Sequence, residues 1–360
     1  MVKSHWVPVL YLKNFGISHK NYNKSFRSKK IYFFYKNQVR KDGINNIKIQ
    51  MLSLNKICTE DKFYSNYMEK YLNIKVETNV LNDAFGKLIS KKSLSILNND
   101  HKLSLQIFIL TQLLRNPANI RRKLEMIKWL KTLPNEIYRK SIQNYRDYIP
   151  QEKLPSTSKE YQKMLENNIF LVSKFPGLLK NFKMQIWINK TNFQFYTSDN
   201  PVIDKSNFMF WNNKIFELNT EYSFSTPRLI LPINPKILIL FGKFPNIRNN
   251  DLQSKKIINN FGVILKINNE IIRNAEHIIL MKSKNLNHLR YAIKINQKCL
   301  EKKYYNFTVK KIKKENINLI TLVEGEEKKE YVCKYCGKKY RSKIKLQEHL
   351  NKYCKIKNKD

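Results

Sequence analysis

Three cysteines and one histidine near the end of the sequence have the spacing of metal ligands. Cys333 and Cys336 are separated by two residues. His349 follows Cys336 after twelve intervening residues, and Cys354 follows His349 after four. Two thiolates close together, followed by an imidazole and a thiolate about one helical turn apart, can surround one tetrahedral Zn²⁺ ion. We therefore predict that these four residues form a structural zinc site.

The residues around these ligands resemble the two-Cys, two-His zinc finger, with Cys354 in place of the final histidine. Tyr340 and Leu346 stand where that small ββα fold has its apolar core. The resemblance implies a helix that begins near Lys343, itself a candidate contact, and three further residues that face nucleic-acid bases: Ser342, Lys345 and Glu348. Residues 331–360 contain ten Lys and Arg against two Asp and Glu, so 10 − 2 = +8, which favours phosphate. One finger reads only about three base pairs, and it can equally bind RNA or a partner protein.

A second group of polar residues occurs in the stretch TSDNP, where Ser198, Asp199 and Asn200 follow an apolar strand pattern. An Asx-turn ahead of Pro201 explains an Asp or Asn at this place. A carboxylate at a strand end can also ligate Mg²⁺ or act as the general base in phosphodiester cleavage. Both interpretations stay open, and Asp199 is a candidate catalytic residue.

His5 and Arg115 are the other candidate catalytic residues. His5 enters an apolar strand, where a structural histidine and a functional one are equally good interpretations. Arg115 lies three residues after Gln112, so the two share a helical face. An arginine beside an apolar helix pairs with a buried carboxylate or binds phosphate, and the structural pairing is the commoner use.

Other chemistry receives less support from the sequence. Glu69 and Glu77 are candidates for a second carboxylate only by elimination. The sequence has no phosphate-binding loop, no dinucleotide fingerprint, no H-E-x-x-H and no G-x-S-x-G. These absences disfavour nucleotide-driven motors, dinucleotide-dependent enzymes, zinc metalloproteases and α/β-hydrolases.

The patterns that surround these residues predict an α+β fold. A helical middle begins near residue 60. Its stretch LSLQIFILTQLL predicts a helix whose buried face excludes Gln112 and Arg115 and consists of Leu103, Ile107, Leu110 and Leu114. ANIRRKLEMIKWLKTL predicts the next helix. Strand patterns lie at 29–36 and 47–52, and again after residue 183, where MQIWI and FQFYT predict a hairpin around Asn189–Asn192.

The rest of the chain completes this architecture. RLILPINPKILILFG predicts two strands broken at Pro232 and Pro235, SKKIINNF and NNEIIRNAEH predict helices, and IILMK predicts a last strand. We expect a helical middle packed on a mostly antiparallel sheet within residues 1–295. A charged linker follows over 296–330, and a ββα zinc finger over 331–360.

Composition points to a polyanionic partner. The 360 residues include 68 Lys and Arg against 28 Asp and Glu, a net charge of +40. Bias toward AT-rich codons raises Lys, but it raises Glu as well, and Glu is not abundant. The charge therefore favours DNA or RNA. The absence of a coherent basic amphipathic helix disfavours a membrane surface. No apolar run approaches the roughly twenty residues of a membrane span, and reduced cysteines favour a bacterial cytoplasm.

Four stretches, in this order and spacing, resemble the bacterial domain of unknown function family four-two-three-eight: SHWVPVLYLKNF, LTQLLRNP, FYTSDNPVI and LILPINPKILIL. A fainter stretch, NNEIIRNAEHIILMK, completes the pattern. The resemblance covers residues 4 to 285 and implies a family but no reaction. The zinc finger is an addition to it.

Two hypotheses follow from the sequence. The first is a nucleic-acid-binding protein of bacterial type, with a nuclease-like effector of a defence or mobile-element system as its enzymatic form. In that form His5, Arg115 and Asp199 surround one site. The second is a non-catalytic regulatory or protein-interaction module, whose finger contacts a partner protein and whose polar residues stabilise the fold.

Overall fold

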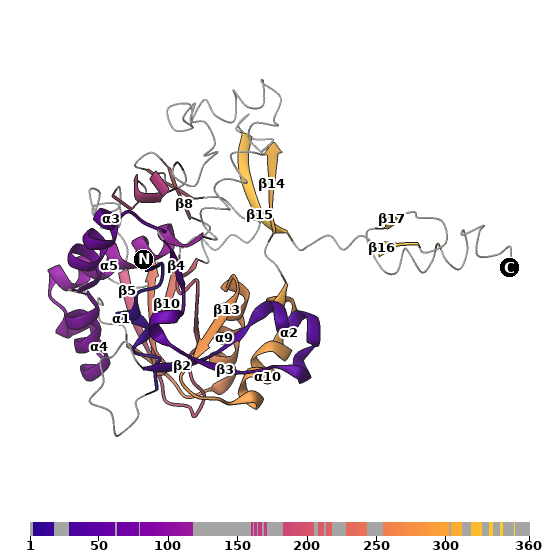
Figure 1. The fold of residues 1–360 in the computed structure, drawn as a ribbon, viewed down its shortest axis with the longest axis horizontal. Helices are drawn as coiled ribbons and strands as arrows, with labels where there is room; N and C mark the ends of the chain where they lie inside the picture. The colour runs from indigo at the N-terminus through magenta and orange to yellow at the C-terminus, as the bar shows by residue number, and fades with distance from the viewer. Residues whose placement is uncertain are drawn as a thin grey trace.

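The structure is a computed structural model. It describes residues 3–17, 29–61, 63–78, 80–117, 183–204, 208–211, 214–217, 228–242, 255–301, 304–311, 318–325, 331–333, 339–340 and 349, with isolated residues between 160 and 170. These residues form helices together with sheets whose strands are mostly antiparallel, so the fold belongs to the α+β class (Figure 1).

The larger sheet has five strands in the order β12-β5-β11-β10-β7. Every neighbouring pair is antiparallel except β12 with β5. All six residues of β11 are buried, which accounts for its unbroken apolar sequence. Pro232 lies inside β10, next to an irregularity in the register with β11, rather than at the strand end as predicted. The strands are β5 (Lys183–Asn189), β7 (Ile203–Asp204), β10 (Arg228–Asn234), β11 (Ile237–Gly242) and β12 (Lys255–Ile258).

The second sheet has four antiparallel strands in the order β3-β2-β13-β6. Its strands are β2 (Lys30–Tyr35), β3 (Gln50–Ser53), β6 (Thr197–Ser198) and β13 (Ile278–Met281). Strand β6 ends directly before Asp199, so this sheet fixes the position of that residue. The adjoining helices are α2 (Lys36–Asp42), α9 (Phe261–Asn274) and α10 (Leu286–Ile295), which lie beside β13 in Figure 1.

The helical part of the molecule contains two π-helical segments. Its elements are α3 (Asn66–Tyr71), the π-helices η4 (Leu72–Glu77) and η5 (Val80–Ala84), α4 (Phe85–Lys91), a 3₁₀ turn η6 (Leu94–Ile96) and α5 (Asn99–Arg115). π-Helical turns are rare and occur frequently at functional sites. The first of them ends at Glu77.

Smaller elements complete the described chain. Strands β1 (Lys3–His5) and β4 (Thr59–Asp61) pair antiparallel, as do β8 (Phe208–Trp211) with β9 (Lys214–Glu217). The short helices are α1 (Val9–Leu12) and the 3₁₀ turns η2 (Ile44–Asn46), η3 (Leu54–Lys56) and η8 (Gln297–Leu300). Further along, β14 (Tyr304–Lys311) pairs with β15 (Asn318–Gly325), and β16 (Tyr331–Val332) pairs with β17 (Lys339–Tyr340).

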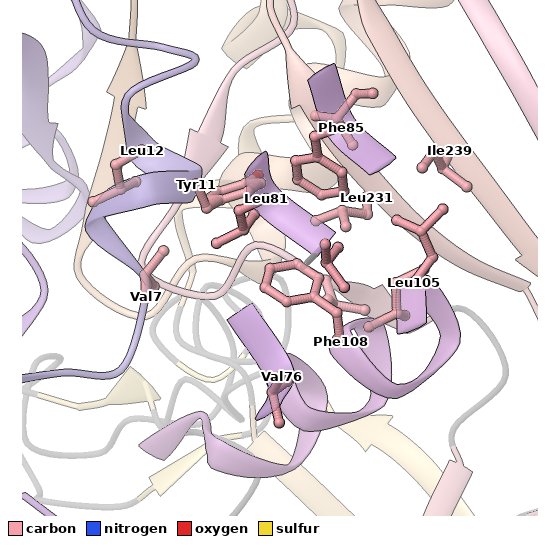
Figure 2. Packing of buried hydrophobic residues seen from close by; sticks show 14 of the residues in the cluster. Val7, Tyr11, Leu12, Val76, Leu81, Phe85, Leu105, Phe108, Leu231 and Ile239 are labelled. Atoms are coloured by element: carbon pink, nitrogen blue, oxygen red, sulfur yellow. The ribbon is translucent and has the colours of Figure 1, made fainter. Parts of the chain in front are cut away.

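The buried hydrophobic residues form two clusters. The first joins the N-terminal segment and the helices α3 to α5 to the five-stranded sheet. Figure 2 shows Phe85 and Phe108 together in this cluster, close to Leu231 of β10, and their ring centroids are 5.5 Å apart. Tyr11 also lies in it, and its hydroxyl hydrogen-bonds to the carbonyl of Pro232 at 2.6 Å. The second cluster lies around α9, α10 and β13.

The predicted hairpin between MQIWI and FQFYT is wrong. The first run forms β5 of the larger sheet, whereas the second ends in β6 of the smaller one. Asn189 explains the separation, because its Oδ1 accepts from the backbone N–H of Thr191 while its Nδ2 donates to the carbonyl of Phe193. These local bonds turn the chain away from β5 instead of returning it alongside.

The helix predicted for SKKIINNF is also wrong. Lys255–Ile258 form strand β12, which pairs parallel with β5, and helix α9 begins only at Phe261. Asn260 caps that helix, since its side chain accepts from the backbone N–H of Gly262 at 2.7 Å. The β-branched pair Ile257 and Ile258 gains more from the sheet edge than from a helix.

The predicted linker over 296–330 contains regular structure, namely η8 and the paired strands β14 and β15. The helix predicted at 118–133 lies outside the described residues. Within the part of the chain that the structure describes, no helix has the length and apolarity needed to cross a membrane.

Candidate functional site

Helix α5 buries more than the predicted face, of which Leu110 is buried and Ile107 and Leu114 pack against the core. Leu103 is exposed, whereas Leu105, Phe108, Gln112 and Arg115 are buried at spacings of three, four and three residues. Apolar residues occur all around this helix, so its sequence does not single out one face, and the neighbouring elements decide which is covered. The prediction that Gln112 and Arg115 point away from the core is therefore wrong.

Arg115 pairs with a buried carboxylate. Its Nη1 donates to Oε1 of Glu77 at 2.6 Å, and its side chain is 0% exposed. Its Nε and Nη2 have no hydrogen-bond partner among the described residues. A guanidinium has five N–H donors, so this arginine retains donors that are directed into the protein and available to a further acceptor.

Gln112 lies one helical turn before Arg115 on the same face. It is 1% exposed, and neither its amide nitrogen nor its amide oxygen finds a partner within the described part of the chain. A buried amide without hydrogen bonds costs free energy. Gln112 therefore places two further buried polar groups beside Arg115.

Glu69 is the carboxyl group whose acidity the fold changes most clearly. It lies on α3, whose first turn is fixed by Ser65, since the Ser65 hydroxyl accepts from the N–H of Met68. Burial raises the pKa of Glu69 to about 7, and the charge of Glu77 adds to the rise. The Arg115 guanidinium counteracts part of it. Oε2 of Glu69 has no hydrogen-bond partner in the residues that the structure covers.

The N-terminal strand brings His5 to the same place. Strand β1 pairs with β4, with His5 opposite Thr59, and the backbone N–H of His5 donates to the Glu69 carboxylate. His5 and Glu69 are half-buried and are thus the members of this group that reach solvent. We refer to the group as the polar centre, and it consists of His5, Glu69, Glu77, Gln112 and Arg115.

The side chain of Asp199 is engaged elsewhere. Its Oδ1 accepts from the backbone N–H of Glu276 at 2.9 Å, and its Oδ2 accepts from those of His277 and Ile278 at 2.7 and 3.1 Å. Burial raises the pKa of Asp199, and these donors counteract part of that rise. The ionised carboxylate, with acceptors at both oxygens, fits the start of strand β13. The catalytic role of Asp199 stays a prediction.

The backbone of Asp199 nevertheless connects the three predicted residues. Its carbonyl oxygen accepts from Nε1 of Trp6 at 3.2 Å and from Nδ2 of Asn116 at 2.7 Å. Trp6 directly follows His5, and Asn116 directly follows Arg115. The TSDNP turn therefore holds both segments that supply the polar centre.

The neighbours of Asp199 stabilise the same turn. Ser198 Oγ donates to the carbonyl of Asn200 and accepts from its N–H. Asn274, near the end of α9, donates through Nδ2 to the carbonyls of Asn200 and Val202. Three polar residues stand together in the sequence because each makes a different buried hydrogen bond.

Residues 3–285 match the family described as Protein of unknown function (DUF4238). The chain belongs to this family. The DUF4238 region includes the polar centre and Asp199, whereas the predicted zinc finger lies beyond it. No curated protein and no solved structure matches the chain.

Only part of the predicted finger is described. Cys333 and His349 are both buried, and β16 pairs with β17, with Tyr331 opposite Tyr340. Cys336 and Cys354 lie outside the described residues, as do the predicted nucleic-acid contacts Ser342, Lys343, Lys345 and Glu348. Among the residues that the structure describes, no group of three or more His, Cys, Asp or Glu side chains could hold a metal ion. That set includes only two of the four predicted zinc ligands, so the zinc site stays a prediction.

Sequence reasoning reached Glu69 and Glu77 only by elimination, yet a pattern could have found them. Met68, Leu72 and Val76 recur every four residues and are all buried. Glu69 and Glu77 directly follow the first and the last of these residues. Carboxylates at the border of an apolar helical stripe are expected to be partly or fully buried.

Proposed function

We propose that this DUF4238 protein binds nucleic acid. The proposal rests on where the charged side chains lie in the fold. Glu77 and Asp199 are buried and are balanced inside the protein by Arg115 and by backbone N–H groups. These carboxylates do not offset the lysines at the surface. A chain with a net charge of +40 therefore presents a surface that attracts phosphates.

The C-terminal finger adds to this binding. Cys333, Cys336, His349 and Cys354 hold one Zn²⁺, which supplies the stability that so short a chain cannot obtain from its own core. The burial of Cys333 and His349 and the pairing of β16 with β17 support this arrangement. Ser342, Lys343, Lys345 and Glu348 would then face the nucleic acid.

Metal analysis tests the finger directly. We expect one zinc per chain in the purified protein and loss of that zinc in Cys354→Ala. Cys299→Ala removes a buried cysteine that is not one of the four predicted zinc ligands and should leave the zinc content unchanged. Wild-type protein without zinc would contradict the proposal.

Salt-dependent binding tests the main proposal. For six to ten phosphate contacts, affinity for DNA or RNA should fall by roughly 10³- to 10⁵-fold between 50 and 200 mM salt. Deletion of residues 331–360 should weaken binding only in part, because 40 − 8 = +32 of the charge remains. If the full chain shows no salt-sensitive affinity for any DNA or RNA, the finger instead serves a partner protein.

A second candidate function is cleavage of phosphodiester bonds at the polar centre. It is favoured by Glu69, whose pKa of about 7 suits a group that gives and takes protons near neutral pH. Glu69 would accept the proton of the attacking water and return it to the leaving oxygen as the phosphorus–oxygen bond to that oxygen breaks. The N–H groups of Arg115 without a partner in the described structure would donate to the phosphate oxygens. Asp199 positions the segments of His5 and Arg115. Mg²⁺ as a further cofactor stays a prediction.

Cleavage of labelled single-stranded DNA, duplex DNA and RNA, with and without Mg²⁺, tests this second function. Glu69→Gln keeps the shape of the side chain but cannot accept a proton, so the rate should fall by about 10²- to 10⁴-fold. Glu60→Gln makes the same change at an exposed position and should keep the wild-type rate. Full activity in Glu69→Gln would remove Glu69 from the reaction. No cleavage by the wild-type protein would leave binding as the function.

A further inference from the structure

Three segments combine positive charge with accessible aromatic rings. Residues 183–198, 255–269 and 277–300 together contain ten Lys and Arg and no Asp or Glu, while Glu270, Glu276 and Glu301 directly adjoin them. These segments contain β5, β12, the first part of α9, and α10. Strands β5 and β12 are neighbours in the larger sheet, and α9 packs against α10 in the second hydrophobic cluster.

Three rings are stacked within this region. The centroids of Phe193 and His288 are 3.7 Å apart, and those of Phe193 and Phe261 are 5.2 Å apart, both with an interplanar angle of 17°. Burial lowers the pKa of His288, so its ring is neutral at pH 7. Phe261, at the end of the stack, is 55% exposed. An exposed phenylalanine that is already aligned in a stack offers a flat apolar face to a further ring.

A second aromatic site with a lysine lies on the neighbouring strands. Nζ of Lys256 is 4.4 Å from the centroid of the Trp187 ring, and the two residues are register partners in the pairing of β12 with β5. Phe261 is the fifth residue after Lys256 along the chain, so their Cα atoms are at most about 18 Å apart. Lys190 joins the two sites, since its backbone N–H donates to the carbonyl of Ile258, and its side chain is exposed.

We propose that this surface, which we call the stacking surface, binds single-stranded nucleic acid. It consists of Trp187, Lys190, Phe193, Lys256, Phe261 and His288. An unpaired base stacks on the exposed face of Phe261, and the lysines neutralise the phosphates on either side. The proposal rests on the nucleic-acid binding proposed above and adds to it the kind of nucleic acid and the surface.

Stacking favours a single strand over a duplex. Bases inside a duplex are already stacked on one another and cannot present a face to a side chain. A groove that combines lysines with aromatic rings binds a single strand with little regard to sequence, because every base has a π-face. A duplex can contact the same lysines, but its bases cannot stack on Phe261, so this ring adds nothing to its affinity.

The test compares two oligonucleotides of equal length and charge, a fifteen-nucleotide poly(dT) and the same backbone without bases. Fluorescence anisotropy with the full chain measures both affinities at one salt concentration. Since stacking of one base changes affinity by roughly 5- to 150-fold, we expect poly(dT) to bind tighter than the abasic strand by a factor in this range. Phe261→Ala should reduce that ratio toward one.

Two variants control for indirect effects. Phe261→Trp retains an aromatic ring and should keep the ratio of the two affinities. That result would show that the ring itself stacks on a base. Tyr67→Ala removes an equally exposed aromatic side chain, 69% accessible, on helix α3 outside the stacking surface, and it should change neither affinity. Circular dichroism confirms that each variant is folded.

The outcomes distinguish the stacking surface from the proposed nucleic-acid binding on which it rests. If the wild-type protein binds both oligonucleotides equally and in a salt-dependent way, nucleic-acid binding stands and the stacking surface is wrong. The stacking surface is also wrong if Phe261→Ala keeps the full preference for bases. If neither oligonucleotide nor duplex DNA binds at any salt concentration, both proposals fail.

Discussion

Buried acidic side chains occur at two places in the molecule, at Asp199 and in the polar centre. The backbone carbonyl of Asp199 connects the two places, but their carboxylates find hydrogen-bond donors to different extents. At Asp199, three backbone N–H groups donate to the two carboxylate oxygens and offset part of the cost of burying this charge. In the polar centre, Arg115 makes one bond to Glu77, while Glu69 keeps an oxygen without a partner in the described structure and has a pKa near 7.

We interpret this difference as one between a structural use of buried charge at Asp199 and the proposed functional use in the polar centre. A carboxylate whose acceptors are all occupied rigidifies the fold, and little remains for a substrate to gain. Donors and acceptors that stay unused inside a protein destabilise it, and such groups persist where a ligand or a reaction needs them. The contrast predicts opposite effects of mutation at the two sites.

The largest expected effect is on the ion pair of the polar centre. Arg115→Met leaves Glu77 buried without its partner, which should lower the free energy of unfolding by about 3 to 5 kcal/mol. Urea denaturation measures the loss. The double variant Arg115→Met with Glu77→Gln should recover a large part of it, whereas the exposed Lys75→Met should change stability by less than about 0.5 kcal/mol. A loss below about 1 kcal/mol in Arg115→Met would show that the pair is not dehydrated.

The second largest loss of stability is expected for Asp199→Asn. The amide NH₂ of asparagine must face one of the three backbone N–H donors, so at least one hydrogen bond to a charged group is lost and a donor stays buried. We expect the free energy of unfolding to fall by about 2 to 3 kcal/mol in urea denaturation. The exposed Asp42→Asn is the matched control and should change little. Unchanged stability together with lost activity would instead support the catalytic role of Asp199.

The smallest effect should be a pH-dependent gain of stability in Glu69→Gln. The folded pKa of about 7 lies above the ordinary value of 4.5. The stability that this group contributes is therefore present below pH 4.5 and is lost as the pH rises through 7. Wild type and variant should melt at similar temperatures at pH 5, and at pH 8 the variant should melt higher. Glu60→Gln should follow the wild type at every pH. Equal melting temperatures of Glu69→Gln and wild type at pH 8 would refute the raised pKa.

Much of the fold follows from local pattern. The strand KKIYFFYK, the strands β10 and β11 and the strand IILMK were all predictable, because runs of β-branched, aromatic and other apolar residues favour strands. The absence of a hairpin at Asn189 was not predictable, since the side-chain bonds of Asn189 redirect the chain and leave no trace in hydrophobic periodicity. The edge strand Lys255–Ile258 was missed for a related reason, because its pairing with β5 is not local.

The residues of the site were easier to predict from the sequence than the role of each residue. His5, Arg115 and Asp199 were singled out as polar residues in apolar surroundings, and the structure brings their segments together at one carbonyl group. Which face of α5 is buried could not be read from a helix that is apolar on several sides. Glu77 ends the π-helical segment η4, and such a segment has no sequence pattern that separates it from an ordinary helix.

The hydrogen bonds of the Asp199 carbonyl also limit when, during synthesis, the N-terminal segment can reach its final position. Its bonds to Trp6 and Asn116 span 193 and 83 residues, so they are contacts of high contact order that local folding cannot make. At a synthesis rate of about 5 to 20 residues per second, roughly 10 to 40 s pass between the emergence of Trp6 and that of Asp199. During that time the N-terminal strand can pair with β4, but Trp6 lacks its bond to Asp199, which becomes possible only when somewhat more than half of the chain has been made.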